Sequence, residues 1–340
     1  MFRKGCLCFI ILAVFATPMT APALAADNVI KWKAATYWPA SLLGYTAFED
    51  FAQRVNEMTG GRLEIKTFPG KAIVPYNELL DATRSGLIQA SYSWAGYSAG
   101  KQPAFSVLTD LTGAWNNEME VFDFYYYGGG LEFLNKLYEP FGVISIGPVI
   151  GGMEVIPSSK PLRGPDDFKG IKIRSPEGML GDFMKKMGAS VVVLPSSDVY
   201  QALDKGVIDA TDYSVPTLNY SLGLHKVAKY FNYPGFHSLP QGDFTVNKKA
   251  WDALPPDIQA ILKTAVRDWC IDFSQRLRIS DADAIAAMKA AGAEPIQWSD
   301  ENLAKARAIV SEVWDEWAKK SPECAEAIQL QRDFIKKLGR

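Results

Sequence analysis

The sequence LLDATRSGLIQASYS at residues 79–93 recurs in outline as VYQALDKGVIDATDY at residues 199–213. Each stretch ends an amphipathic helix, stops it at a glycine and continues into a short apolar strand with a polar tip. A unit of helix, turn and strand that is built twice predicts two α/β lobes, although such units are also common by chance. Because open α/β sheets bind ligands at the carboxyl ends of their strands, the two polar tips predict a crevice shared by the lobes.

The residues around these two stretches alternate between strand and helix patterns. Residues 29–37, 62–68 and 88–92 predict strands, with helical segments between them. Alternating strands and helices predict a mostly parallel sheet. The pattern returns between residues 170 and 210, so we expect an α/β protein with two mixed sheets flanked by helices.

A long helix is predicted near the C-terminus. Pro255-Pro256-Asp257 is a typical start signal, and helical periodicity holds to about Ala290, before Gly292. A helix of this length spans roughly 50 Å, which is longer than one lobe. It therefore predicts a bridge across both lobes, and the alternative is two shorter helices with a break near Ser274.

The first 25 residues have the features of a secretory signal peptide. Arg3 and Lys4 precede an apolar run, Cys8 to Ala16, and Ala23-Leu24-Ala25 is a small-residue cleavage site. The apolar run is too short to span a bilayer, and the alternative is an uncleaved anchor. Residues 1–25 are therefore predicted to be removed, which places residues 26–340 outside the cytoplasm.

The composition excludes some classes of protein. A hydrophobic content of 48% and a charged content of 22% are typical of a globular protein. Without Arg3 and Lys4 the chain carries a small excess of acidic side chains and no basic stripe, which argues against nucleic acid as a partner. After processing only Cys270 and Cys324 remain. We expect them to form a disulfide, and two unpaired thiols are the alternative.

Motifs for enzyme chemistry are absent from the sequence. It has two histidines, His225 and His237, and no zinc, nucleophile-elbow or phosphate-loop signature. We therefore expect no enzyme, no cofactor and no metal. His237 lies in an aromatic loop, near the predicted crevice, and is expected to line the ligand site. The alternative is an enzyme that combines His237 with a carboxylate in the crevice.

One basic residue is placed to bind an anion. Arg174 follows Ile171 and Ile173 in alternation, at the carboxyl end of a strand, where its guanidinium can hold a carboxylate by two parallel hydrogen bonds. The alternative is a surface pair with Glu177 or Asp182. Aromatic residues near predicted strand ends offer apolar walls for a small ligand; they are Tyr37, Trp38, Trp94, Tyr97, Tyr213, Tyr233 and Phe236.

Three motifs together resemble a known family. The run PDDFKGIKIR at residues 165–174 is similar to the P-x-D-L/F-K-G-x-K-x-R signature of the periplasmic solute-binding proteins of TRAP (tripartite ATP-independent periplasmic) transporters. VYQALDKGVIDA at residues 199–210 and GGRLEI at residues 60–65 resemble the same family. The resemblance covers essentially the whole mature chain.

The resemblance implies a two-lobed periplasmic binding protein, with crossing strands and a bridging helix, that closes around a small organic anion. It places residues 26–150 and about 240–278 in the first lobe, and residues 151–239 and about 279–340 in the second. The implied partner is a TRAP membrane permease and the expected state is a periplasmic monomer. A protein that presents its ligand to a sensor or chemoreceptor is the alternative.

The resemblance also implies roles for site residues. Arg174 is the expected partner of the ligand's carboxylate, and Asp212 and Tyr213 are expected to line the cleft. Asp212-Tyr213 and the Tyr233–Phe236 loop resemble the subgroup that binds 2-oxo and 2-hydroxy acids.

Some members of that subgroup hold a cation with a Gln and two Glu side chains. The corresponding positions are Met153, Asp212 and Ser238, so two of the three ligands are missing and a bound cation is doubtful. Glu154 stands where many members have Arg. This predicts a monoanion that carries a hydrogen-bond donor or positive group rather than a dicarboxylate, unless Glu154 faces solvent or pairs with Lys160 or Arg163.

Overall fold

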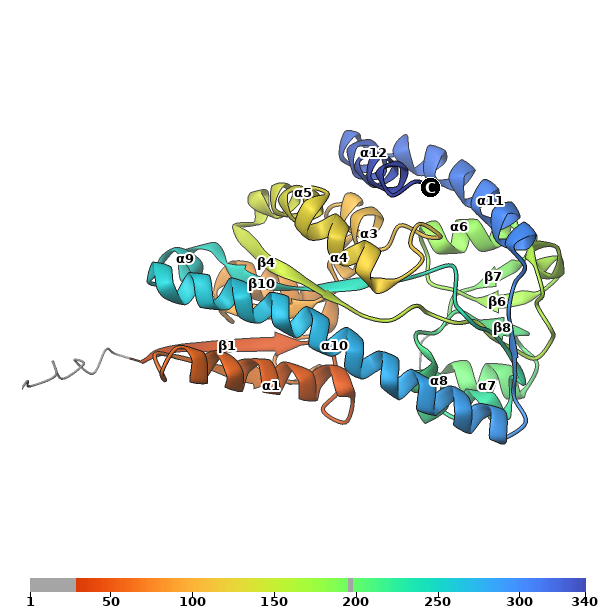
Figure 1. Ribbon diagram of the computed structural model, residues 1–340, viewed down its shortest axis with the longest axis horizontal. Coiled ribbons are helices and arrows are strands. Elements are labelled where there is room, and N and C mark those ends of the chain that lie inside the picture. The colour runs from red at the N-terminus through yellow and green to blue at the C-terminus, as the bar shows by residue number, and fades with distance from the viewer. Residues whose placement is uncertain (1–28, 195–197) are drawn as a thin grey trace, which may run out of the picture.

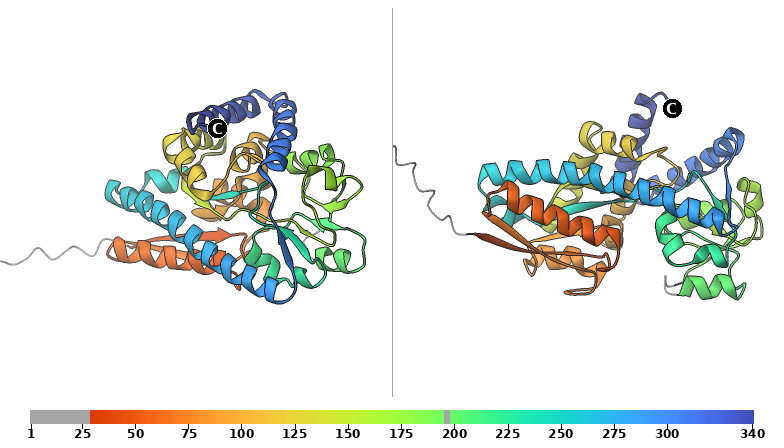
Figure 2. Two further views of the ribbon diagram at one scale, coloured as in Figure 1. Left: turned by 45° about the vertical axis from the view of Figure 1, so that its right-hand side comes forward. Right: turned by 60° about the horizontal axis from the view of Figure 1, so that its bottom comes forward.

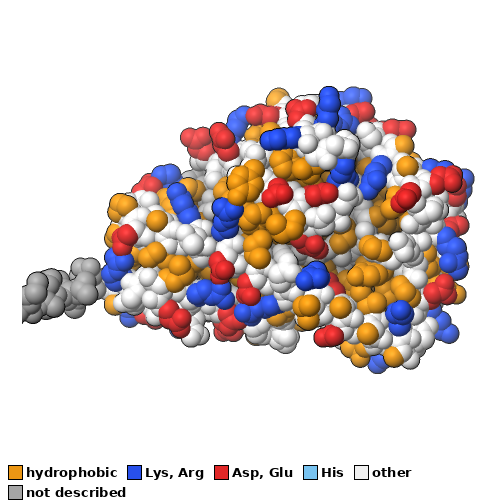
Figure 3. All heavy atoms as spheres, in the orientation of Figure 1, with side chains coloured by type: hydrophobic (Ala, Val, Ile, Leu, Met, Phe, Trp, Pro, Cys, Tyr) orange, Lys and Arg blue, Asp and Glu red, His pale blue; other side chains and the backbone are white. Residues whose placement is uncertain are grey.

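The computed structural model describes residues 29–194 and 198–340, which form two lobes with a β-sheet in each (Figure 1). The predicted signal peptide, residues 1–25, lies outside the described residues. Within the described part of the chain, no helix is long and apolar enough to cross a membrane. On the face drawn in Figure 3, acidic and basic side chains are interspersed without a basic stripe.

The first sheet has five strands in the order β2-β1-β3-β10-β4. β1 is parallel to β2 and β3, whereas β10 is antiparallel to β3 and β4. In β1 the buried Trp32 and Ala34 alternate with the exposed Lys31 and Lys33, so one face is buried along its length while the other is exposed at the start of the strand and buried at Ala35. The strands are β1 (Ile30–Thr36), β2 (Leu63–Phe68), β3 (Ala90–Ser93), β4 (Val143–Ile150) and β10 (Gln241–Asn247).

The second sheet has six short strands in the order β11-β9-β5-β8-β6-β7. β6 is parallel to β7 and β8, whereas β5 is antiparallel to β8 and β9. Both sheets are therefore mixed, as predicted. The strands are β5 (Pro157–Ser158), β6 (Lys172–Arg174), β7 (Ser190–Val192), β8 (Ala210–Thr211), β9 (Tyr230–Asn232) and β11 (Glu294–Ile296).

The repeated sequence unit is a repeated structural unit. α2 ends at Gly86 and leads into β3, and α7 leads past Gly206 into β8. Both glycines have positive φ, 79° and 67°, which is a conformation that glycine adopts without steric cost. Ile88 and Ile208 are buried at matching places. The two polar tips, after β3 and after β8, thus lie at the carboxyl ends of strands in different lobes.

Helices flank both sheets, and the longest, α10, bridges them (Figures 1 and 2). The first part of α10 packs on β4 and α1, and its later part packs on α8 and β11. It continues through Ser274, whose hydroxyl donates to the carbonyl oxygens of Cys270 and Ile150, so the predicted single helix is confirmed. The helices are α1 (Leu43–Met58), α2 (Leu79–Ser85), α3 (Ala104–Thr109), α4 (Glu118–Tyr127), α5 (Gly130–Tyr138), α6 (Met179–Lys186), α7 (Val199–Asp204), α8 (Pro216–Ser221), α9 (Lys248–Asp252), α10 (Pro256–Ala290), α11 (Asp300–Ala318) and α12 (Pro322–Lys337).

The C-terminal helix differs from the expected division into lobes. α11 packs on α6 of the second lobe, but α12 turns back onto α3 and α5 of the first. Phe334 packs against Phe124, and Gln331 donates to the carbonyl of Val107. The placement of all residues from 279 to 340 in the second lobe is therefore wrong for α12, because its apolar side chains cover the helices of the first lobe.

The predicted disulfide is also wrong. Cys270 and Cys324 both carry free thiols in the structure. Cys270 lies in the middle of α10, which packs on β4, whereas Cys324 lies in the first turn of α12. Both are fully buried among apolar side chains, so each behaves as a small hydrophobic residue.

Candidate functional site

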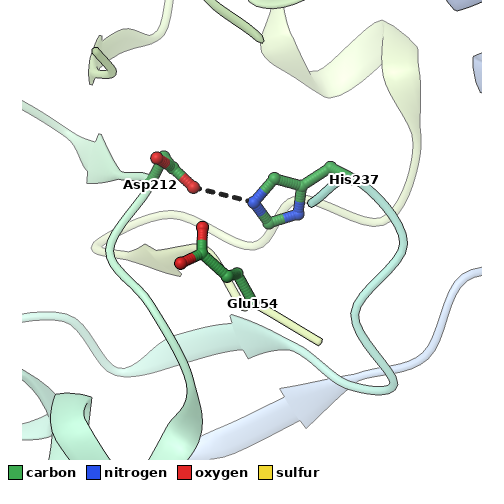
Figure 4. A group of neighbouring side chains, drawn as sticks. All are labelled: Glu154, Asp212 and His237. Carbon is green, nitrogen blue, oxygen red and sulfur yellow. Dashed lines mark hydrogen bonds and ion pairs between the residues drawn. The ribbon is translucent and has the colours of Figure 1, made fainter. Parts of the chain in front are cut away.

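Two carboxyl groups and an imidazole, those of Glu154, Asp212 and His237, point toward one another (Figure 4). Glu154 comes from the segment after β4, Asp212 directly follows β8, and His237 lies in the segment between β9 and β10. Donor atoms of the three side chains lie within 4.8 Å of one another. We call these three residues the acidic cluster.

A hydrogen bond orders the acidic cluster. His237 Nε2 and Asp212 Oδ1 are 2.8 Å apart, and both side chains are almost fully buried. The backbone holds the histidine in place, because the Gly113 amide donates to the His237 carbonyl and the Glu154 amide donates to the next carbonyl, that of Ser238. His237 was predicted to lie near the crevice, and the structure shows that its ring orients Asp212.

Glu154 contributes a second carboxylate to the same place. Burial raises its pKa well above the usual range, and the nearby Asp212 and Asp110 raise it further. The alternative partners for Glu154 are engaged elsewhere, because Lys160 pairs with Asp209 and Arg163 with Glu294. Two carboxyl groups this close together in a buried place need a bound cation, a shared proton or a hydrogen-bond donor to stabilise them.

Arg174 ends β6, as predicted, and makes no ion pair within the described residues. Its Nη1 donates to the carbonyl oxygen of Asp212 at 2.8 Å, and its Nε donates to that of Leu194 at 3.3 Å. Its guanidinium carbon lies 5.7 Å from the ring centre of Tyr213. Two bonds to carbonyls fix the guanidinium without neutralising it, so its charge remains available to an anion.

Four aromatic side chains of the first lobe, which the sequence predicts to line the cleft, form a cluster of their own. The ring of Tyr97 lies 5.4 Å from that of Tyr37 and 5.1 Å from that of Trp94, and Tyr37 lies 5.0 Å from Trp38. Burial raises the pKa of the Tyr97 phenol, with Glu154 as the next cause, while Arg174 lowers it. Tyr97 therefore lies within electrostatic reach of both poles of the site, the guanidinium and the acidic cluster.

Phe236 and Tyr233, two of the predicted wall residues, have other positions. The Phe236 ring stacks on Trp298 at 4.0 Å and meets His237 edge-on at 5.4 Å. Tyr233 is exposed. Phe236 thus packs between His237 and Trp298.

Asp110 is a site residue that has no signal in the sequence. It directly follows α3 and accepts hydrogen bonds from Ser238 Oγ at 2.7 Å and from the Leu239 amide at 3.1 Å. Burial raises the pKa of Asp110 to about 6. Asp110 and its partners are far apart in the sequence, so only the fold shows that Asp110 fixes the segment carrying His237.

The structure changes the expectation about a cation. Ser238 bonds to Asp110, and Met153 packs against the apolar core, so neither position supplies a ligand. Glu154 and His237, each one residue away, stand close to Asp212 instead. Calcium prefers oxygen ligands. The two carboxylates fit such an ion, and the imidazole, already bonded to Asp212, serves to orient one of them.

Comparisons with known proteins agree with this architecture. The family model for bacterial extracellular solute-binding protein, family 7 (DctP), matches residues 34–321. A monocarboxylate 2-oxoacid-binding periplasmic protein of Nostoc sp. is 32% identical over 91% of this chain and 85% of its own.

Solved structures extend the likeness to the fold. An apo, open TRAP periplasmic solute-binding protein of Rhodobacter sphaeroides is 37% identical, with a TM-score of 0.82 over 91% of this chain and 98% of its own. One from Colwellia psychrerythraea, with bound calcium and pyruvate, is 27% identical, with a TM-score of 0.79 over 92% and 95% of the two chains. The chain thus belongs to the DctP family, the periplasmic solute-binding proteins of TRAP transporters.

Proposed function

We propose that this protein captures a small 2-oxo or 2-hydroxy monocarboxylate in the periplasm, together with a cation, and delivers it to a TRAP permease. The main support for this proposal is that one guanidinium without an ion pair, that of Arg174, lies beside a cluster with two carboxyl groups. A single guanidinium suits a single carboxylate. A second carboxylate on the ligand would meet Glu154 and Asp212, which disfavours a dicarboxylate. Binding of monocarboxylate 2-oxoacids by the Nostoc relative supports the same ligand class.

Arg174 is the residue to test first. Arg174→Ala should reduce pyruvate affinity by at least about thirtyfold, because an enclosed, charge-assisted contact contributes a few kcal/mol, of order 2–5. Arg174→Lys should also bind poorly, since an ammonium cannot form two parallel hydrogen bonds with a carboxylate. Arg163→Ala, which removes an exposed arginine of the same lobe, is the control. Calorimetric affinities of Arg174→Ala within threefold of the parent protein would remove Arg174 as the anchor.

The acidic cluster gives a second test, of the cation. Carboxylates of Glu154 and Asp212 that hold a cation would place it where the ligand's oxygen atoms complete its shell. We expect removal of divalent ions and sodium to weaken pyruvate binding at least tenfold, and calcium to restore it. Glu154→Gln should weaken the calcium effect but leave the fold intact. Equal pyruvate affinity with and without added cations would show that pyruvate binding needs no cation, and that His237 is partner enough for Asp212.

A binding role without turnover agrees best with this geometry. His237 is fully buried, and Nδ1, the ring nitrogen that Asp212 does not engage, is buried as well, so the ring does not face a substrate as a general base would. Pyruvate recovered chemically unchanged after long incubation is the expected result. A changed product would favour the periplasmic enzyme considered from the sequence.

A further inference from the structure

A second cavity, of about 160 Å³, lies behind the segment that carries His237. Its walls come from four parts of the chain. They are the residues before α4, the loop between β9 and β10, one face of α11 and the side chain of Phe183 in α6. Most of the lining is apolar. The lining residues are Gly113, Trp115, Asn116, Phe183, Pro234, Gly235, Phe236, Leu303, Ala306, Arg307 and Val310.

This cavity is distinct from the site that holds Arg174 and the acidic cluster. Neither Arg174 nor any member of the cluster lines it. Phe236 separates the two, because its ring lines the cavity and meets His237 edge-on. The cavity also spans both lobes, since Gly113 belongs to the first and α11 packs on α6 of the second.

One edge of the cavity carries a positive charge without a carboxylate partner. Arg307 makes one hydrogen bond, from Nη2 to the Asn116 side-chain oxygen at 2.8 Å, and no ion pair within residues 29–194 and 198–340. The nearby carboxylate of Glu120 is occupied, because it accepts from the amide of Asn116 and pairs with Arg340. Trp115, deeper in the lining, has a buried indole N–H without a partner among the described residues.

We propose that this cavity is a second ligand site, which takes a small monocarboxylate with a flat apolar body. Apolar cavities of about 150 Å³ hold a benzene ring, so the volume suits one ring. A carboxylate on that ring would reach the guanidinium of Arg307 at the edge. The charge and the apolar lining thus fit one molecule of the benzoate type rather than a plain hydrocarbon or a dianion.

Occupancy would act on the first site through two short connections. The Gly113 amide holds the carbonyl of His237 at 2.8 Å, and Phe236 is the residue before it. A ring placed between Trp115 and Phe236 therefore packs against the segment that positions His237. The proposal stands whether or not the first site takes a 2-oxo acid.

The test uses benzoate as the probe and the Arg174→Ala protein as the background, because the first site could also bind this acid. Calorimetry should show saturable binding of one benzoate per chain. Ala306→Phe, which fills the cavity, should abolish it, whereas Ala308→Phe on the exposed side of α11 should not. Arg307→Gln should weaken binding about tenfold. Lys305→Gln, which removes a neighbouring cation paired with Glu301, should leave it unchanged.

Three results decide the matter. Loss of benzoate binding in Ala306→Phe and weakening in Arg307→Gln, with both controls unchanged, would support the site. Absence of saturable binding in Arg174→Ala, or binding that neither variant alters, would overturn it. Because Arg307 is exposed, its variant keeps the test valid if Ala306→Phe fails to fold. Titrating pyruvate into the parent protein, which keeps Arg174, tests the first site separately.

Discussion

Buried carboxyl groups are the least ordinary residues of this protein. Asp243 lies in β10, between β3 and β4, and is 1% exposed. The Tyr138 hydroxyl lies 3.3 Å from one of its oxygens, and the other has no partner among the described residues. Burial raises the pKa of Asp243 from 3.8 to about 7. The native state therefore holds a proton here that the unfolded chain releases.

This proton makes stability depend on pH. Since the folded pKa lies above the unfolded one, the stabilisation is complete below about pH 4 and is lost as the pH rises through 7. The full change corresponds to roughly 4 kcal/mol. We expect the free energy of unfolding in urea to fall between about pH 4 and 7, and Asp243→Asn to flatten that fall. Asp252→Asn, at an exposed pair with Lys248, is the control, and identical pH profiles for the two variants would refute the assignment.

Residues whose role follows from local pattern were predictable, and those defined by distant contacts were not. Arg174 was placed correctly because alternation fixes the end of a strand. The bond between His237 and Asp212 joins two loops, and nothing in either loop specifies the other. Register along a loop is equally hidden, so the sequence did not show that Glu154 and His237 both lie beside Asp212.

At the scale of elements, the segment between β9 and β10 has the closest packing against the site. A Cβ atom on Gly235 would lie 2.1 Å from the carbonyl oxygen of Glu154 and 2.6 Å from Cγ of Met153. Neither neighbour has room to retreat, because one is backbone and the other is packed in the core. The segment must therefore keep glycine at this position to bring His237 beside Glu154.

Gly235→Ala should accordingly displace the segment and weaken ligand binding. We expect at least a tenfold loss of pyruvate affinity with about 1–3 kcal/mol of lost stability, as overpacking usually costs. Gly100→Ala is the matched control, since a Cβ there meets nothing within 4 Å. Affinity and unfolding measurements on both proteins test the idea, and an unaffected Gly235→Ala would contradict it.

Element types were largely predictable, whereas their partners were not. The hydrophobic period gave α10 and the first three strands within a few residues, because each has a strong local pattern. The return of α12 to the first lobe depends on which lobe offers an apolar surface, and the separation of Cys270 from Cys324 depends on that return. Such choices are made by tertiary packing alone.

At the scale of the whole molecule, ligand binding should stabilise and compact the protein. A ligand that binds only the native state, at a hundred times its Kd, adds about 2.7 kcal/mol to the free energy of unfolding. Closure of two lobes joined at a hinge should also reduce the radius of gyration. Thermal unfolding and small-angle scattering with pyruvate check both effects, and Arg174→Ala should show neither. A stabilised protein of unchanged radius would exclude hinge closure.

The position of β10 has a consequence for how the chain folds. β10 lies between β3 and β4 in the first sheet, and the buried Ser91 and Thr245 hydroxyls meet across it at 2.6 Å. The first lobe therefore cannot complete its sheet until the residues of the second lobe have been synthesised. Pairing over such sequence distances is slow, so we expect the sheet of the first lobe to be completed late in folding. Neither lobe can be expected to fold as a fragment cut from the other.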